Sequence, residues 1–263
     1  MKMQEGAATV GPAIRTRNNT RNSKGNKGIR FLANWAAFAL LPAALVPVLR
    51  NTGLINDYYY QVLMMIGINS ILSVSLGLVN GFSGQFSLGH AGFMGIGAYV
   101  AAVLTSKAAT LPFLPATLMG GIASAVVGYA VGIPAFRVRG DYLAVITLAL
   151  NMIVVNVAQN INYIGGPRGF PGIIPYSNFT WIWLWVVLCV LVIRNLIVSG
   201  HGRAIMSVRE NEVAAQLGGI DVQRYKLLAF FVACFFAGVA GSLSAHMLQF
   251  IAPQNYNIFR TFD

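Results

Sequence analysis

Residues 227–248 read LLAFFVACFFAGVAGSLSAHML, a run without any Asp, Glu, Lys or Arg. Within it, Ala233, Ala237, Gly241 and Ala245 recur every fourth residue, so four small side chains share one stripe of an α-helix. About 20 apolar residues are needed to cross the hydrocarbon core of a bilayer. In lipid, stripes of small residues let helix backbones approach and associate. The stretch therefore predicts a transmembrane helix inside a helical bundle.

Other parts of the chain have the same character. The segment 111–136 carries a second small-residue stripe, formed by Gly120, Ser124, Gly128 and Gly132. The chain of 263 residues is 56% hydrophobic and only 10% charged, whereas soluble domains carry about a quarter of charged residues. We predict an all-α, polytopic transmembrane helical bundle of about seven spans, at 31–49, 58–79, 89–106, 111–136, 141–160, 180–198 and 227–248.

The positive charge is distributed unevenly along the chain. Residues 1–30 hold seven of the 18 Lys and Arg residues in a segment without apolar periodicity, which predicts a disordered basic tail before the membrane domain 31–263. With a cytoplasmic N-terminus, seven further cations lie in the inner loops and four lie outside. This bias follows the positive-inside rule, so the net charge of +11 reflects membrane orientation and predicts no nucleic-acid partner.

The polar segment Gly81 to Leu88 joins the second and third predicted spans and contains no charge. It is either a cytoplasmic turn or a broken helix that lines a cavity, because loose backbone at membrane depth needs protein or water around it. Gln85, Ser87 and His90 are the candidate path-lining residues, although packing or hydrogen bonding would also explain each. No second ligand stands near His90, so we expect no metal site.

The inner loop between the last two spans predicts a helix of its own. Residues 203–217 contain no proline or internal glycine, and Gly218-Gly219 supply a C-terminal stop, which predicts a short amphipathic helix over about 203–219. Met206, Val213 and Leu217 fall on one stripe. The helix is either a lever for a partner protein or a segment lying on the lipid surface.

Four segments resemble the LivM-type permeases of branched-chain amino-acid ABC importers: GFSGQFSLGHAGFMGIGAY (81–99), GDYLAVITLAL (140–150), GGPRGFPGIIP (165–175) and GRAIMSVRENEVAAQLGGIDVQRYKLLAF (202–230). Within the last, 212–220 is similar to the coupling-loop motif of such permeases. Ala215 and Gly219 keep the spacing of that motif, whereas Glu212 stands one residue farther upstream. The resemblance implies these ATPase-coupling residues: Arg209, Glu210, Glu212, Ala214, Ala215 and Gly219.

The resemblance also implies a function and its partners. The chain would be a permease subunit in a bacterial inner membrane, moving branched-chain or related neutral amino acids. It would act with a second homologous permease, two cytosolic ATP-binding subunits and an external solute-binding protein, which would dock on the outer loop 160–179. The chain has no G-x-x-x-x-G-K-[ST] motif, so we expect neither enzyme activity nor a cofactor of its own. Family members continue through further helices after the seventh span, so the chain is either a fragment or lacks them.

Two alternatives stay open to test. A permease for urea, short amides or other polar amino acids could use the same scaffold. An intramembrane serine protease is suggested by Gly81-Phe82-Ser83-Gly84, the serine motif of rhomboid proteases, together with a histidine in a later span, His246. The predicted topology places Ser83 near the inner face and His246 at the outer interface, too far apart to share a proton.

Overall fold

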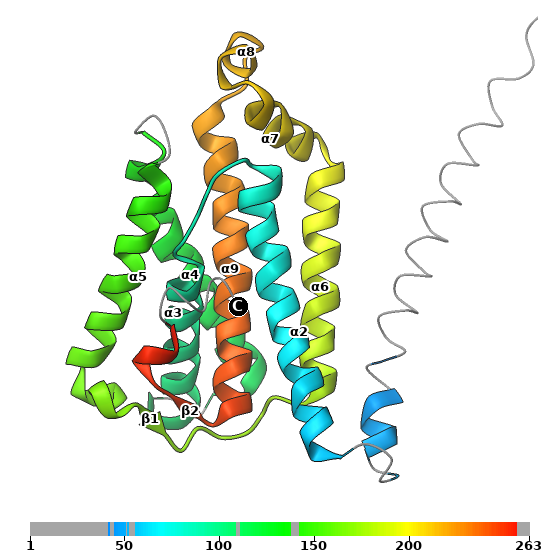
Figure 1. The fold of residues 1–263 in the computed structure, drawn as a ribbon, viewed down its shortest axis with the longest axis vertical. Helices are drawn as coiled ribbons and strands as arrows, with labels where there is room; N and C mark the ends of the chain where they lie inside the picture. The colour runs from blue at the N-terminus through cyan, green and yellow to red at the C-terminus, as the bar shows by residue number, and fades with distance from the viewer. Residues whose placement is uncertain are drawn as a thin grey trace, which may run out of the picture.

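The computed structural model describes residues 56–108, 111–137 and 142–256, together with 45–50 and the single residues 42 and 52. In this part of the chain, five helices are long and apolar enough to cross a membrane. They are α2 (Asp57–Gly77), α4 (Phe113–Ala135), α5 (Tyr142–Asn160), α6 (Phe179–Val198) and α9 (Val222–Leu248), with the shorter apolar α3 (His90–Val103) among them (Figure 1). The all-α transmembrane bundle is thereby confirmed. The tail 1–30 and most of the predicted span 31–49, namely 31–41, 43 and 44, lie outside the described residues.

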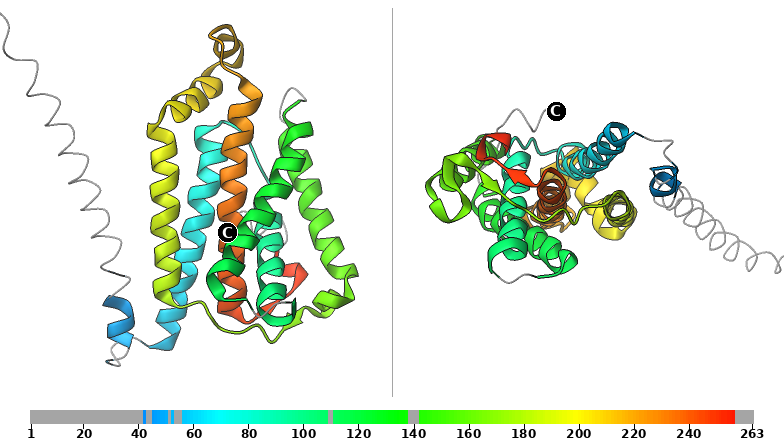
Figure 2. Two further views of the ribbon diagram at one scale, coloured as in Figure 1. Left: turned by 180° about the vertical axis from the view of Figure 1, so that it is seen from behind. Right: turned by 90° about the horizontal axis from the view of Figure 1, so that it is seen from below.

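Short elements connect and close the bundle. Two π-helical turns extend α2 and α3, namely η1 (Leu78–Phe82) and η2 (Leu104–Ala108). At one end of the bundle lie α7 (Gly200–Glu210) and α8 (Glu212–Leu217), as Figure 2 shows from behind. At the other end lie η3 (Asn162–Ile164), η4 (Gly166–Arg168), η5 (Pro253–Tyr256) and an antiparallel pair of two-residue strands, β1 (Phe170–Pro171) and β2 (Phe250–Ile251).

Helix α9 forms the centre of the bundle. In the most apolar 18-residue segment of α9, 72% of the residues are buried, whereas 28% are buried in the corresponding segments of α5 and α6. A Cβ atom at Gly241 would overlap the carbonyl of Met94 in α3, and one at Gly128 in α4 would lie 2.6 Å from Sγ of Cys234. Both small-residue stripes therefore mark places where helix backbones meet, which explains why α3 and α4 can lie against α9.

Two serine side chains fasten the same three helices together. Ser124 Oγ in α4 donates to the carbonyl of Phe93 in α3 at 2.9 Å, and Ser242 Oγ in α9 donates to the carbonyl of Gly97 at 3.1 Å. Such bonds between helices are possible only where the backbones approach closely. They define the relative heights of α3, α4 and α9.

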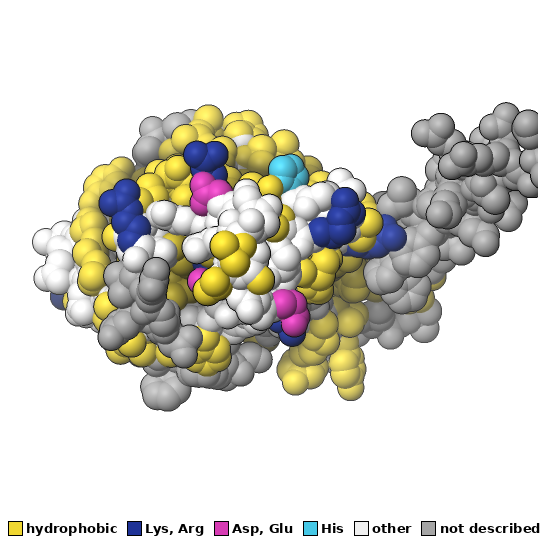
Figure 3. All heavy atoms as spheres, turned by 90° about the horizontal axis from the view of Figure 1, so that it is seen from above, with side chains coloured by type: hydrophobic (Ala, Val, Ile, Leu, Met, Phe, Trp, Pro, Cys, Tyr) yellow, Lys and Arg dark blue, Asp and Glu magenta, His cyan; other side chains and the backbone are white. Residues whose placement is uncertain are grey.

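Most of the described cations gather at the α7–α8 end. Figure 3 looks onto this end and shows Lys and Arg side chains around its rim. The sequence places the following at this end of their helices or in the adjoining turns: Arg137, Arg194, Arg203, Arg209, Arg224 and Lys226. Arg50 and Arg168 lie beside elements of the opposite end. By the positive-inside rule, the α7–α8 end is the one expected to face the cytoplasm.

The close packing predicts a contrast between two glycines. Gly238→Ala would bring its Cβ to 2.5 Å from Cβ of Ser124 and 2.8 Å from the carbonyl of Gly120, whereas a Cβ at Gly77 meets nothing within 4 Å. We expect Gly238→Ala to destabilise the chain by about 1–3 kcal/mol. Gly77→Ala should leave stability nearly unchanged. Thermal unfolding in detergent measures both, and equal melting temperatures would contradict the packing argument.

Candidate functional site

The site begins where α2 loses its regular hydrogen bonding. The N–H of Ser83 donates to the carbonyl of Leu78 at 3.0 Å, and the N–H of Gln85 donates to that of Val79 at 3.0 Å, so the helix widens into a π-helical end. Gly84 then turns the chain with φ of +67°, a backbone conformation that costs glycine little. Residues 83–89, which we name the linker, form no helix or strand before α3 starts at His90.

The linker runs back into the bundle. His90 Nε2 lies 2.8 Å from Oγ of Ser75, which precedes the end of η1 by about two helical turns, or roughly 10 Å of rise. The N–H of Leu88 donates to Oγ1 of Thr147 in α5 at 3.1 Å. Figure 1 shows the linker passing from the end of α2 towards the middle of the bundle. Of the two interpretations of this segment, the geometry favours the broken helix over the surface turn.

The linker and the first residue of α3 concentrate buried polar atoms that have no partner among the described residues. They are Oγ of Ser83, both amide atoms of Gln85, Oγ of Ser87 and Nδ1 of His90. The exposed fraction is 7% for Gln85, 1% for Ser87 and 2% for His90. An unsatisfied buried polar group costs about 1–3 kcal/mol. Since most buried polar groups in native proteins are paired, such a cluster indicates a place for water or a polar ligand.

The hydrogen-bond network determines what His90 offers. The hydroxyl of Ser75 donates its one proton to the carbonyl of Leu72 at 2.9 Å. The imidazole N–H of His90 is therefore assigned to Nε2, which donates to Ser75, and Nδ1 remains as an acceptor without a partner. No third group orients this ring for proton transfer among the residues described. His90 thus presents an acceptor at the point where the linker meets α3.

A cavity of about 640 Å³ opens beside the linker at the α7–α8 end. Gln85 lines it, whereas Ser87 and His90 are not among its lining residues. Glu212 of α8 forms an ion pair with Lys226 of α9 at this cavity. Its other lining residues come from the linker, the end of α4 and the turn after it, α5, α8 and α9: Gly84, Phe86, Ala135, Phe136, Arg137, Leu143, Val213, Gln216, Val222 and Gln223. The cavity joins the linker to the predicted coupling segment.

The predicted helix over 203–219 is in fact two helices. The backbone of Asn211 is extended, with φ of −160° and ψ of 108°, and its Oδ1 accepts from the N–H of Ala214 at 3.0 Å. Asn211 is therefore the N-cap of α8, a role for which asparagine is strongly preferred. The asparagine at position 211 could have indicated a helix start in the sequence. The absence of proline and glycine from 203–217 instead favoured one continuous helix.

The break also rearranges the predicted apolar stripe. Met206 on α7 is half-buried, whereas Val213 and Leu217 on α8 are 66% and 87% exposed. The single stripe of three residues is therefore wrong. Helix α8 projects from the end of the molecule (Figure 1), and its exposed Val213 and Leu217 form what we name the apolar tip.

Two of the candidate coupling residues shape α8. Ala215 is buried and belongs to a small cluster with Val208 and Val222. Gly219 has φ of +80°, its N–H donates to the carbonyl of Gln216 at 2.9 Å, and the N–H of Ile220 donates to that of Ala215 at 3.0 Å. This is the Schellman ending of a helix, in which glycine avoids the penalty for positive φ.

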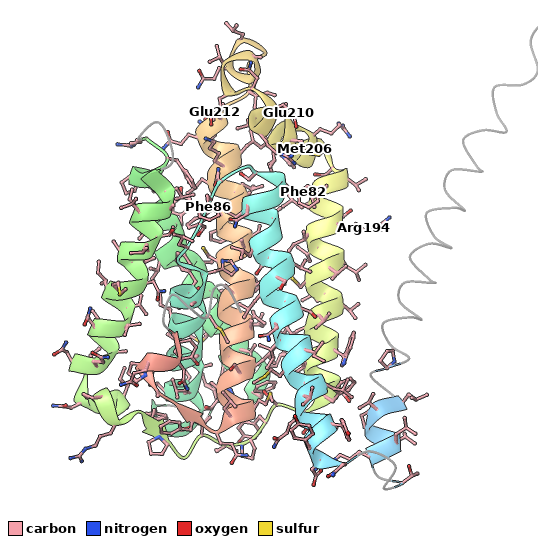
Figure 4. All side chains as sticks on the ribbon, viewed as in Figure 1. Phe82, Phe86, Arg194, Met206, Glu210 and Glu212 are labelled. Carbon is pink, nitrogen blue, oxygen red and sulfur yellow. The ribbon has the colours of Figure 1, made fainter. Side chains whose placement is uncertain are left out.

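The remaining candidates face different surroundings. Glu210 and Ala214 are exposed, and Glu212 pairs with Lys226. Figure 4 shows Glu210 and Glu212 at the α7–α8 end, and Glu212 lines the same cavity as Phe86. Arg209 differs from all of these, since its Nη1 donates to the carbonyl of Gly81 in η1 at 2.8 Å.

The serine and histidine of the protease hypothesis stay apart. Ser83 follows η1 at the α7–α8 end, whereas His246 lies in the last turn of α9 at the other end. His246 is fully buried, with Nδ1 2.7 Å from the carbonyl of Ser242 and Nε2 3.1 Å from Oγ1 of Thr105. The expectation of an interfacial His246 is therefore wrong, because the residue ties α9 to η2. The pair cannot act as nucleophile and base.

The predicted outer loop 160–179 contains η3, η4 and β1 and covers the end of the bundle opposite α7–α8. Its strand β1 pairs with β2, and a Cβ at Gly169 would lie 2.6 Å from the carbonyl of Ile251. Ser177 Oγ donates to the carbonyl of Leu243 at 2.9 Å. These contacts fasten the loop to the end of α9. Its role in docking a binding protein stays a prediction.

Comparison with known proteins gives a consistent match. Residues 58–263 match the family described as branched-chain amino acid transport system / permease component. The high-affinity branched-chain amino acid transport system permease protein LivM of Salmonella typhimurium is 34% identical over 221 residues, and its Escherichia coli counterpart is 33% identical over 221 residues. Each match covers 71% of this chain and 52% of the relative.

A probable branched-chain amino acid transport permease protein LivH of Methanocaldococcus jannaschii is 26% identical over 178 residues, which covers 59% of this chain and 55% of that protein. The chain spans about half the length of the curated relatives it matches. No solved structure matches it.

Replacing Gln85 and replacing Ser75 should have opposite effects on stability. The amide of Gln85 has no partner among the described residues, whereas the hydroxyl of Ser75 is hydrogen-bonded. Gln85→Met removes two unsatisfied atoms in a side chain of similar length, so we expect the free energy of unfolding to rise by about 1 kcal/mol. Ser75→Ala leaves Nε2 of His90 without its partner and should lower the free energy of unfolding by about 1–3 kcal/mol. Thermal unfolding of the purified chain measures both. A loss of stability in Gln85→Met would show that its amide is satisfied.

Proposed function

The chain belongs to the permease-component family of branched-chain amino acid transport systems, and from this we propose that it is the membrane permease subunit of a binding-protein-dependent ABC importer. It translocates branched-chain or related neutral amino acids through the inner membrane, while partner subunits bind and hydrolyse ATP. The observation that carries this proposal is the uncharged linker inside the bundle, next to a cavity at the α7–α8 end, because the side-chain polar atoms of Ser83, Gln85 and Ser87 have no partner among the described residues.

The chemistry of the linker suits such a solute. An amino acid with an apolar side chain is a zwitterion without net charge, so its path needs donors for the carboxylate and acceptors for the ammonium group. The amide of Gln85 and the hydroxyl of Ser87 supply both kinds, and Nδ1 of His90 supplies an acceptor. The linker carries no fixed charge, so this part of the path would hold the solute weakly enough to release it. These three residues are therefore the proposed lining of the path.

The α7–α8 segment is the proposed contact with the ATP-binding subunits. Exposed apolar side chains at the tip of a charged segment are typical of a docking surface, and Val213 and Leu217 provide them. Glu210, which is exposed beside this tip, offers a partner for a cation of an ATPase, whereas Glu212 pairs with Lys226 of this chain. The second permease subunit, two such ATPases and an external solute-binding protein complete the assembly. The loop 160–179 at the opposite end is the proposed site for the binding protein.

Uptake measurements test the proposed path. In the assembled transporter reconstituted into liposomes, Gln85→Ala and His90→Ala should each lower ATP-dependent uptake of labelled leucine by about tenfold, the effect of losing one hydrogen bond to a charged group. Ser70→Ala serves as the control, because its hydroxyl bonds back to the carbonyl of Ile66 in its own helix. Unchanged uptake in both variants would refute the lining role. Uptake of urea in place of leucine would favour the amide permease.

Binding measurements test the docking tip. Val213→Ser and Leu217→Ser should each weaken the association of the ATP-binding subunit by about tenfold, since exposed apolar anchors dominate such interfaces. Val198→Ser is the matched control, because Val198 is 65% exposed at the same end but belongs to α6. Co-purification and titration of the ATPase onto the detergent-solubilised permease measure the effect. Equal weakening in all three variants would show that the tip has no special role.

A further inference from the structure

We propose that Arg209 is a positioning residue that transmits the movement of the α7–α8 segment to the linker. This inference rests on the proposed function of an ATP-driven importer and adds a physical connection within this chain. The side chain of Arg209 on α7 contacts the turn from Gly81 to Gly84. This turn immediately precedes Gln85, which lines the cavity.

The guanidinium group holds the end of η1. Nη1 of Arg209 donates to the carbonyl of Gly81 at 2.8 Å. Carbonyl groups in the last turn of a helix lack partners within the helix, and a cation near them is favoured by the helix dipole. The two residues are 128 positions apart in the sequence, so this bond joins two segments that the chain itself does not connect closely.

The aliphatic stem of Arg209 covers the next part of the turn. A Cβ at Gly84 would lie 2.8 Å from Cγ and 3.4 Å from Cβ of Arg209, and φ of Gly84 is +67°. The linker therefore leaves η1 beneath this stem, with no room for a larger residue at position 84. One side chain thus contacts the turn at two points, which defines the direction in which Gln85 continues.

The other end of Arg209 is firmly attached to the coupling segment. Its neighbour Val208 is 1% exposed and packs with Ala215 of α8 and Val222 of α9. The ion pair between Glu212 and Lys226 fastens α8 to α9 a second time. A force applied to the apolar tip of α8 would therefore displace the end of α7 together with Arg209.

The position of the cavity completes the connection. It is lined on one side by Gly84, Gln85 and Phe86, and on another by α8 residues. Movement of α7–α8 would thus act on both walls: directly on the α8 wall, and through Arg209 on the linker wall. Since Arg209 is exposed, its bond to a neutral carbonyl adds little to stability, so the contact matters for position.

Transport efficiency tests the proposal in the complete complex. In liposomes containing both permease subunits, the ATPases and the binding protein, we expect Arg209→Met to retain ATP hydrolysis but to lower leucine transported per ATP by about tenfold. Arg209→Lys should recover only part of this ratio, because an ammonium group lacks the forked donors of a guanidinium. Arg203→Met, on the exposed face of the same helix, is the control and should match the parent protein.

A labelling experiment reports the movement itself. The native residues Cys189 and Cys234 are buried, so Phe86→Cys introduces an accessible thiol on the linker, where Phe86 is 54% exposed. With Arg209 present, the rate of maleimide labelling should differ between the nucleotide-free and the vanadate-trapped complex. Adding Arg209→Met should abolish that difference. Gly84→Ala, which would push the stem of Arg209 aside and strain the turn at φ of +67°, should reduce the difference while the side chain at position 209 remains an arginine.

The outcomes separate this inference from the proposed function. A nucleotide-dependent labelling difference that survives in Arg209→Met would overturn the positioning role, whether or not uptake is altered. A normal ratio of leucine to ATP in the same variant would overturn it as well. If the parent complex itself shows no ATP-driven leucine uptake, the proposed function fails, and the labelling comparison alone then decides whether Arg209 moves the linker.

Discussion

The structure depends on the close approach of α9 to α3 and α4. Glycine and alanine at the contacts remove the side chains that would otherwise separate the backbones, and serine hydroxyls then reach carbonyls of the neighbouring helix. In a membrane, such packing and hydrogen bonding replace the hydrophobic force that drives helices together in water. With these three helices held at defined heights, α2 and α6 lie along one side and α5 along another, and the end of α2 comes next to the start of α9 (Figure 2).

The linker is the part of the chain that this packing makes possible. The linker lacks regular backbone hydrogen bonds. It is tolerated inside the bundle because neighbouring helices provide partners, such as Thr147 of α5 for the N–H of Leu88. The side-chain amide of Gln85, Oγ of Ser87 and Nδ1 of His90 nonetheless have no partner among the described residues. Stability is reduced at the place where the proposed solute path runs, which is the usual compromise between folding and function. Arg209 then connects this weakly satisfied segment to the projecting α7–α8 end.

Sequence patterns predict several of these features correctly and fail to predict others. The spans over α2, α4, α5, α6 and α9 were predictable, because long apolar runs have few alternatives in lipid. The break at Asn211 was not predicted, because a cap is a local hydrogen bond that overrides the helical preference of its neighbours. The position of His246 near the end of the last span predicts an interfacial side chain, whereas Thr105 and Ser242 satisfy it inside the bundle.

The sequence by itself determined the class of fold, the family and the small-residue faces on which the helices meet, because hydrophobic length and residue size act locally along each helix. Only the tertiary structure decided that the linker enters the bundle, that Gln85 lines the cavity while Ser87 and His90 do not, and that Arg209 reaches Gly81. Each of these depends on atoms far apart in the chain. Their distances follow from how the helices pack, and no local pattern of residues encodes them.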